Sequence, residues 1–305
     1  MKILFICSNL IGDTILSSGV IKHFVNKHKN AKLSFVIGPT AAPLLKNYAN
    51  VERIIIFKKR KFNIHWIEIL KKTYNTKWDI IIDFRSSILS FFLKKKNKYI
   101  FKKQKGLHHI DQLNSIFGFP CSDLFIPTSI EEQKKAQCDL SETYKHVVIF
   151  PGGNWTPKLW SVENYNLVMK SLQSKYDKIK FILVGSLKEK EKFYKELIKD
   201  IKEELIIDLF GANLTITSAF MKKSDLFVGN DSGLMHLAVS NKIRVISLFG
   251  PTDDNLYGPY GNNNIIIRTK ESLDYFKSIN IDKNKSYMNS IKTDIVLRTC
   301  ESYLK

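Results

Sequence analysis

A phosphate-binding turn is predicted in the second half of the chain. The segment Gly-Asn-Asp-Ser-Gly at residues 229–233 follows an apolar run that predicts a strand, and a helical pattern begins at Leu234. Asp231 or Ser232 would cap that helix, and the main-chain amides at its start would face a diphosphate, because helix starts favour negative charge. Gly233 removes the side chain where the phosphate must approach.

His236 adds to this pattern. It lies one turn after Ser232 on the same helix face, where it can donate to a phosphate or to a sugar hydroxyl. A single histidine on a helix is commonly a structural polar residue. The strand, the turn and the in-phase histidine together indicate a site for a nucleotide-sugar diphosphate.

A second candidate loop follows the strand predicted at Val147–Phe150. Gly152 and Gly153 free the backbone to wrap an anion, and Thr156 and Lys158 supply a hydroxyl and a cation. The loop does not match the GxxxxGK[ST] pattern of a P-loop. It is either a phosphate contact or an ordinary loop with a surface lysine.

Gly12 and Asp13 stand at the corresponding place in the first half, between the strand predicted at Lys2–Ile6 and a helix predicted over Asp13–His28. Gly12 permits a tight turn and the close approach of a ligand. Asp13 is either the cap of this helix or a carboxylate that acts on a ligand. The dinucleotide fingerprint GxGxxG occurs nowhere in the chain, which argues against a nicotinamide oxidoreductase.

Other charged groups follow predicted strands. Glu189 can accept hydrogen bonds from a ribose or be a solvated helix charge. Lys59, Arg60 and Lys61 can meet an anionic acceptor or form a solvated face. No Asp-x-Asp occurs, so the usual carboxylate clamp for a metal-bound nucleotide sugar is missing, and neither a metal site nor a cofactor is predicted.

The segment Ser87–Lys96 combines five apolar residues with three consecutive lysines. It can contact a membrane surface, or form a buried helix that packs on a sheet. No apolar run reaches the roughly 18 residues of a membrane span. Polar residues interrupt the apolar start of the chain before it could form the core of a signal peptide.

Short apolar runs alternate with helical patterns, which predicts α/β domains with doubly wound parallel sheets. A polar stretch at about Ile130–Lys145 marks a seam, so we expect domains over residues 1–140 and 141–305, with ligands in a cleft between the carboxyl ends of the two sheets. A last helix, Thr293–Leu304, caps one domain or crosses back to the first. The predicted strands are Lys2–Ile6, Lys32–Ile37, Arg53–Phe57, Asp79–Asp83, Lys98–Phe101, Val147–Phe150, Lys180–Val184, Leu205–Leu209, Asp225–Val228 and Arg244–Phe249.

The net charge of +19 comes mainly from lysine, since only six of the 48 basic residues are arginine. An anionic partner (nucleic acid, anionic lipid or a phosphorylated substrate) and a compositional drift towards lysine both account for it. The four cysteines are scattered without CxxC spacing, so reduced thiols in the cytosol are expected.

These motifs resemble those of the ADP-heptose:lipopolysaccharide heptosyltransferases and their relatives, glycosyltransferase family 9. The resemblance covers nearly the whole chain. Its most specific part is the run Asn-Asp-Ser-Gly-x-x-His-Leu-Ala at 230–238, followed by Phe-Gly-Pro-Thr at 249–252. Further matching segments are Ile-Gly-Asp at 11–13, Trp-Asp-Ile-Ile-Ile-Asp-Phe-Arg at 78–85, Pro-Gly-Gly at 151–153 through Lys-Leu-Trp at 158–160, and Asp-Leu-Phe-Gly at 208–211.

The resemblance implies a GT-B fold with two Rossmann-like domains, an acceptor site in the first domain and a donor site in the second. Asp13 is similar to the family's proposed general base, and Gly12 and the basic residues 59–61 fall on the acceptor side. Lys158 matches a lysine on the donor phosphates, and Glu189 aligns with a ribose-binding glutamate. With Thr156 from the loop pattern, the expected donor site comprises Thr156, Lys158, Glu189, Asp231, Ser232, Gly233 and His236.

The activity that the resemblance implies is an inverting, metal-independent transfer of a heptose from ADP-heptose to a lipopolysaccharide-core or related glycan acceptor. The expected location is the cytoplasm, with peripheral contact at the inner face of the cytoplasmic membrane. The alternatives are an enzyme of the same fold with another donor sugar, or a nucleotide-sugar 2-epimerase. A nucleic-acid-binding protein would explain the charge, but the chain has no recognition-helix or RNP pattern, so nucleic acid is not an expected partner.

Overall fold

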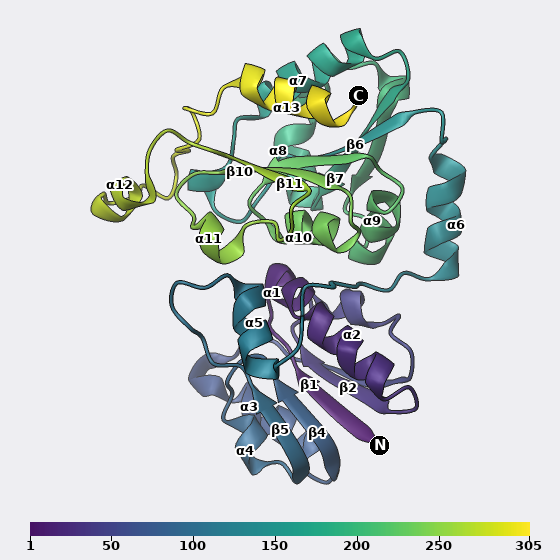
Figure 1. Cartoon of the computed structure of the whole chain (residues 1–305), viewed down its shortest axis with the longest axis vertical. Helices are drawn as coiled ribbons and strands as arrows, with labels where there is room; N and C mark the ends of the chain where they lie inside the picture. The colour runs from purple at the N-terminus through teal and green to yellow at the C-terminus, as the bar shows by residue number, and fades with distance from the viewer. The chain divides into compact units, whose positions relative to one another are not determined.

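The computed structural model describes residues 1–305, except for the side chain of Asn63. The chain divides into two units, Met1–Pro127 and Thr128–Lys305. The first unit contains β1 (Lys2–Ile6), α1 (Ile11–Leu16), α2 (Ser18–Lys27), β2 (Lys32–Ile37), η1 (Ala42–Leu45), β3 (Val51–Ile56), η2 (Lys61–Asn63), α3 (His65–Thr73), β4 (Trp78–Asp83), α4 (Leu89–Phe92), β5 (Lys95–Ile100) and α5 (His109–Phe117) (Figure 1). The second contains α6 (Ile130–Asp139), β6 (Lys145–Phe150), η3 (Thr156–Lys158), α7 (Val162–Lys175), β7 (Ile179–Gly185), α8 (Leu187–Ile198), η4 (Glu203–Leu205), β8 (Ile206–Phe210), α9 (Leu214–Met221), β9 (Leu226–Asn230), α10 (Gly233–Ser240), β10 (Arg244–Phe249), α11 (Asp254–Tyr257), β11 (Asn264–Arg268), α12 (Leu273–Ser278) and α13 (Thr293–Tyr303).

Five parallel strands form the sheet of the first unit, in the order β3-β2-β1-β4-β5. Side chains alternate along β1. Phe5 makes an edge contact with Phe24 of α2, whereas Leu4 and Ile6 belong to the core cluster that also contains Ile69 of α3. Helices therefore cover both faces of this sheet, which explains why its central strands are continuous apolar runs.

Six parallel strands form the sheet of the second unit, in the order β11-β10-β9-β6-β7-β8. Met169 of α7, Leu197 of α8 and Val296 of α13 enter one core cluster with the strands. Figure 1 shows α9 and α10 on the opposite side of this sheet from α7 and α13. The C-terminal helix α13 therefore packs on the core of the second unit, in agreement with the predicted role of capping one domain.

Each sheet reverses its winding direction at one place. In the first unit β1, β2 and β3 follow one another outwards and β4 starts again on the other side of β1; in the second unit β9 starts again beside β6. Loops after the two strands that flank such a reversal turn to opposite faces and leave a crevice at the carboxyl edge of the sheet. The loops after β1 and β4, and those after β6 and β9, are therefore the natural ligand positions.

The structure corrects two predictions about element bounds. The helix predicted over Asp13–His28 is two helices, α1 and α2, separated at Ser17, whose hydroxyl donates to the main-chain oxygen of Asp13 at 2.8 Å. The predicted domain boundary at residue 140 lies instead between Pro127 and Thr128. Its physical reason is that α6 packs against α9 (Figure 1), so this helix belongs to the second unit.

The remaining elements agree closely with the predicted ones. All ten predicted strands are present, although β5 begins three residues earlier than expected, and β11 was not predicted. The segment Ser87–Lys96 is not the buried helix that was one of its two predictions, and its contact with a membrane surface stays a prediction. It forms the single turn of α4 and then enters β5.

A close packing contact in the first unit can be tested directly. A Cβ added to Gly19 of α2 would lie 1.9 Å from the main-chain oxygen of Cys121. We expect Gly19→Ala to lower the free energy of unfolding by about 1–3 kcal/mol, although alanine favours helices, because the main chain at Cys121 must move. Urea denaturation followed by circular dichroism measures the change, with Ser171→Ala on the exposed face of α7 as the control. Equal midpoints for the two variants would contradict this packing.

Candidate functional site

The side chain of Asn230 joins the loop after β6 to the turn after β9. Its Nδ2 donates to the main-chain oxygens of Pro151 at 2.9 Å and Gly152 at 3.1 Å. Its Oδ1 accepts from the main-chain nitrogen of Trp160 at 3.1 Å and from the hydroxyl of Tyr165 at 3.0 Å. All four hydrogen-bonding positions of this fully buried amide are thus used. The two loops at the reversal of the second sheet are held in one arrangement.

Two of the predicted donor-site residues meet beside this amide. The Nζ of Lys158, at the end of η3, lies 3.0 Å from Oδ2 of Asp231, and each side chain is only 12% exposed. Ser232 is the N-cap of α10, since its hydroxyl accepts from the main-chain nitrogen of Met235 at 3.3 Å. Ser232 is therefore the cap, and Asp231 is the partner of the lysine. The cation is held next to the amides that open α10.

Glu189 connects the glycine loop to α8. One carboxylate oxygen accepts from the main-chain nitrogen of Gly153 at 2.7 Å, and the other accepts from the main-chain nitrogen of Ser186 at 2.7 Å in a capping box. A Cβ on Gly152 would lie 2.0 Å from the carboxylate of Glu189, so a side chain there would displace this carboxylate from Gly153. Glu189 is not a solvated helix charge, because it shapes the loop that carries Lys158. Its contact with a ribose stays a prediction.

The other predicted donor residues occupy the same edge of the sheet. Thr156 begins η3 and is partly exposed, and Gly233 is the first residue of α10. His236 is buried within α10. Hydrogen bonds from Thr156 or His236 to a ligand stay predictions.

Asp13 lies in the first turn of α1, after β1. Its Oδ2 accepts from the hydroxyl of Ser8 at 2.8 Å, and that hydroxyl accepts from the main-chain nitrogen of Leu10 at 3.2 Å. The prediction that Asp13 caps the helix is wrong, because Leu10 holds the N-cap position and Asp13 is already the third helical residue. Its carboxylate is instead oriented by Ser8. Gly12 precedes it in the same turn and is partly exposed.

Arg85 stands across the reversal of the first sheet, after β4. Its Nη1 donates to Oδ1 of Asn9 at 3.3 Å, and its guanidinium lies 5.2 Å and 5.1 Å from the ring centroids of Phe57 and Trp66. Burial lowers the pKa of Arg85, and the nearby carboxylates of Asp83 and Asp13 act in the opposite direction. A partly buried cation is therefore fixed within electrostatic range of Asp13.

Two further buried groups shape this edge. The Asp83 carboxylate accepts from the main-chain nitrogens of Arg85 at 2.9 Å and Ser87 at 2.8 Å, and burial nevertheless raises its pKa. Burial lowers the pKa of His109 to about 4, although the Asp13 carboxylate raises it. At neutral pH the imidazole of His109 is therefore uncharged.

The predicted acceptor residues Lys59, Arg60 and Lys61 follow β3 and are exposed. Arg60 pairs with Glu68 at 2.6 Å. These residues lie at the carboxyl edge of the first sheet, as Asp13 does, because β3 is parallel to β1. Their contact with an acceptor stays a prediction.

Asn230 and Arg85 were not predicted as site residues. Asn230 was visible only as a member of the predicted turn at 229–233 and of the motif at 230–238, and Arg85 only as a member of the motif at 78–85. Asn230 ends β9 and Arg85 follows β4, two strands that flank a sheet reversal, but using these positions as a signal requires the strand order.

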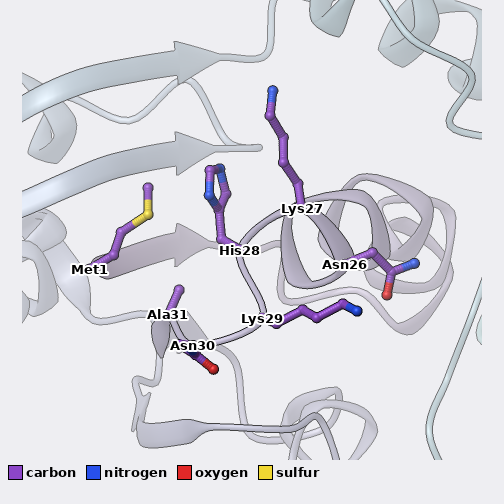
Figure 2. Close-up of a pocket in the computed structure, with 7 residues that line it drawn as sticks. All are labelled: Met1, Asn26, Lys27, His28, Lys29, Asn30 and Ala31. Atoms are coloured by element: carbon purple, nitrogen blue, oxygen red, sulfur yellow. The ribbon is translucent and has the colours of Figure 1, made fainter.

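A shallow pocket elsewhere is lined by Met1 and by the turn between α2 and β2 (Figure 2). It lies where β1 and β2 begin, at the opposite edge of the sheet from Asp13, and it contains none of the predicted site residues. Among the described residues, no group of three or more His, Cys, Asp or Glu side chains could hold a metal ion. None of the helices described is long and apolar enough to span a bilayer.

The ion pair between Lys158 and Asp231 should contribute more to the free energy of unfolding than an exposed ion pair does. In a double-mutant cycle with Lys158→Met and Asp231→Asn, we expect a coupling free energy of about 1–3 kcal/mol, because both side chains are largely screened from water. The control is the pair of Lys170 and Asp200, with side chains 53% and 40% exposed, for which about 0.5 kcal/mol or less is expected. Urea denaturation measures both cycles. Equal coupling in the two pairs would contradict the enclosed position of the site pair.

The family model for glycosyltransferase family 9 (heptosyltransferase) matches residues 110–286. The chain is 26% identical to lipopolysaccharide heptosyltransferase 1 of Campylobacter coli, over 98% of this chain and 97% of that protein. It is 25% identical to lipooligosaccharide heptosyltransferase 2 of Campylobacter jejuni, over 87% of this chain and 85% of that protein.

Solved structures show the same fold. A glycosyl transferase of family 9 from Veillonella parvula matches with a TM-score of 0.79 at 20% identity, over 99% of this chain and 97% of that one. The heptosyltransferase WaaC of Escherichia coli, solved with ADP, matches with a TM-score of 0.75 at 17% identity, over 99% and 100%. The two α/β units with parallel sheets, and their similarity to these structures, identify the fold as GT-B-like. The chain therefore belongs to glycosyltransferase family 9.

Proposed function

We propose that the protein transfers a heptose from ADP-heptose to a sugar of a lipopolysaccharide or lipooligosaccharide core. The single observation that carries this proposal is the donor edge of the second unit, where Lys158 is paired with Asp231 beside the start of α10. Support also comes from the relatives, which are heptosyltransferases of lipopolysaccharide and lipooligosaccharide, and from the similar fold of an enzyme solved with ADP.

On the donor side, the diphosphate binds against the amides that open α10. Gly233 leaves the helix start open, and Lys158 supplies a positive charge. As the bond between the anomeric carbon and the phosphate oxygen breaks, negative charge grows on the departing ADP. Lys158 and these amides stabilise that charge most strongly in the transition state, since they are already in position.

On the acceptor side, Asp13 is the general base. An acceptor hydroxyl attacks the anomeric carbon from the face opposite the diphosphate, its proton passes to the Asp13 carboxylate, and the configuration inverts. Ser8 orients the carboxylate through its 2.8 Å hydrogen bond. Lys59, Arg60 and Lys61 attract an anionic acceptor to the same edge. No step is assigned to a metal ion or to a cofactor.

The proposal assigns the donor to the carboxyl edge of the second unit and the acceptor to the carboxyl edge of the first. We place this reaction in the cytoplasm, at the inner face of the cytoplasmic membrane. The free, largely buried thiols of Cys7, Cys121 and Cys300 are compatible with a reducing compartment.

The role of Asp13 gives the sharpest test. We expect Asp13→Asn to lower the rate of ADP release from ADP-heptose in the presence of a core acceptor by about 10²–10⁴-fold, because the base is lost. Binding of ADP should be unchanged, since the donor edge is in the other unit. Asp123→Asn, at an exposed carboxylate of the same unit, is the control and should retain full activity.

Transfer by Asp13→Asn within twofold of the unaltered protein would contradict the assignment. Release of a free epimer from a UDP-sugar without acceptor would instead support the 2-epimerase alternative. Activity with another nucleotide sugar, and none with ADP-heptose, would correct the donor.

A further inference from the structure

The short helix α4 exposes three large apolar side chains. Leu89 and Leu93 are buried in the core cluster beneath α3 and fix α4 to the first unit. Ile88, Phe91 and Phe92 point outwards and are 65%, 59% and 58% exposed. Figure 1 shows α4 next to α3. Packing of the core therefore accounts for the buried residues of this segment but not for the exposed ones.

Lysines surround these side chains. Lys94, Lys96 and Lys98 are all exposed. The Nζ of Lys98 lies 3.9 Å from the ring centroid of Phe91, so cationic and apolar groups are in direct contact. We call the set Ile88, Phe91, Phe92, Lys94, Lys96 and Lys98 the α4 patch.

Protection of a sheet edge explains only part of this composition. Strand β5 is at the edge of its sheet, and exposed lysines there discourage pairing with another chain. Lys96 and Lys98 on β5 are sufficient for this protection. It gives no reason for two adjacent exposed phenylalanines, which an isolated soluble surface would disfavour.

We propose that the α4 patch binds the surface of an anionic phospholipid bilayer. Phe91, Phe92 and Ile88 enter the boundary between headgroups and acyl chains, while the lysine ammonium groups remain at the level of the lipid phosphates. Charge complementarity favours this partner, because Lys94 and Lys98 add positive charge to the patch and the chain has a net charge of +19, whereas Lys96 is paired with Asp79 at 2.7 Å. The inference names the surface through which the proposed placement at the membrane would be achieved, and a failure of vesicle binding would leave the transfer reaction itself unaffected.

The position of the patch in the chain gives it a further consequence. Only Ser86 and Ser87 separate Arg85, at the carboxyl edge, from Ile88. Ser87 is anchored to the buried Asp83 through its main-chain nitrogen at 2.8 Å and its hydroxyl at 2.7 Å. The patch is therefore joined through two serines, of which Ser87 is buried, to the connection that forms one side of the crevice at the carboxyl edge.

Co-sedimentation of the full chain with vesicles tests the proposal. With vesicles of phosphatidylglycerol and phosphatidylcholine, we expect binding roughly tenfold or more tighter than with phosphatidylcholine alone, and weaker at high salt. Phe91→Ser combined with Phe92→Ser, and separately Lys94→Gln combined with Lys98→Gln, should each weaken binding roughly tenfold. The controls are Ile130→Ser and the pair Lys134→Gln and Lys135→Gln on the exposed face of α6, which should bind as the unaltered chain does.

Phe91→Trp combined with Phe92→Trp keeps the apolar surface and should retain binding, with a blue shift of tryptophan fluorescence on adding anionic vesicles. This variant and the lysine variant test the patch even where the serine variant fails to fold. Equal loss of binding in patch and control variants would overturn the proposal, because the attraction would then be a general effect of net charge. Absence of binding to anionic vesicles would also overturn the proposal. So would a dimer, detected by light scattering, that the serine variant abolishes, because the patch would then be an interface between copies of the chain.

Discussion

The donor edge of the second unit depends on the buried amide of Asn230. A side chain without hydrogen-bond partners at this depth would be costly, and here four bonds compensate the loss of water. Because these bonds reach the loop after β6 and the start of α7, the amide holds Lys158 opposite Asp231. Glu189 adds a second constraint on the same loop through Gly153. A cation and a helix start are thus in place before any ligand binds.

The first unit uses a different arrangement at the corresponding edge. The carboxylates of Asp13 and Asp83 accept hydrogen bonds from Ser8 and Ser87, respectively. The guanidinium of Arg85 lies against two aromatic rings. The basic side chains after β3 are exposed, and among them Arg60 pairs with Glu68 at 2.6 Å. The contrast fits the two proposed tasks. A diphosphate has a fixed geometry that a rigid site can match, whereas an extended glycan needs a base in a defined place and a broader surface of attraction.

The sequence predicted most of the fold, because parallel strands covered on both faces are short apolar runs and their loops carry glycines and helix caps. A helix cap at Asp231 or Ser232, and a glycine-containing loop before Lys158, follow from local patterns of this kind. The break at Ser17 and the place of α6 could not be predicted, since both depend on tertiary contacts. The same is true of Asn230 and Arg85, whose partners are distant in sequence. Asp13 illustrates the limit: its residue type fits a helix cap, and only the start of α1 at Ile11 shows that it is not one.

The measurement that tests this account most directly is the affinity for ADP, by titration calorimetry, of the unaltered chain and of Asn230→Leu. Asn166→Leu is the control, because Asn166 is a buried asparagine of the same unit whose amide donates to Leu197 on α8 at 3.0 Å, away from the donor edge. We predict that Asn230→Leu remains folded but binds ADP roughly tenfold or more weakly. Loss of a buried hydrogen-bonding group costs about 1–3 kcal/mol, which corresponds to a change in affinity of this size. Asn166→Leu should bind ADP as the unaltered chain does. Equal affinity of Asn230→Leu and the unaltered chain would contradict the claim that this amide organises the donor site.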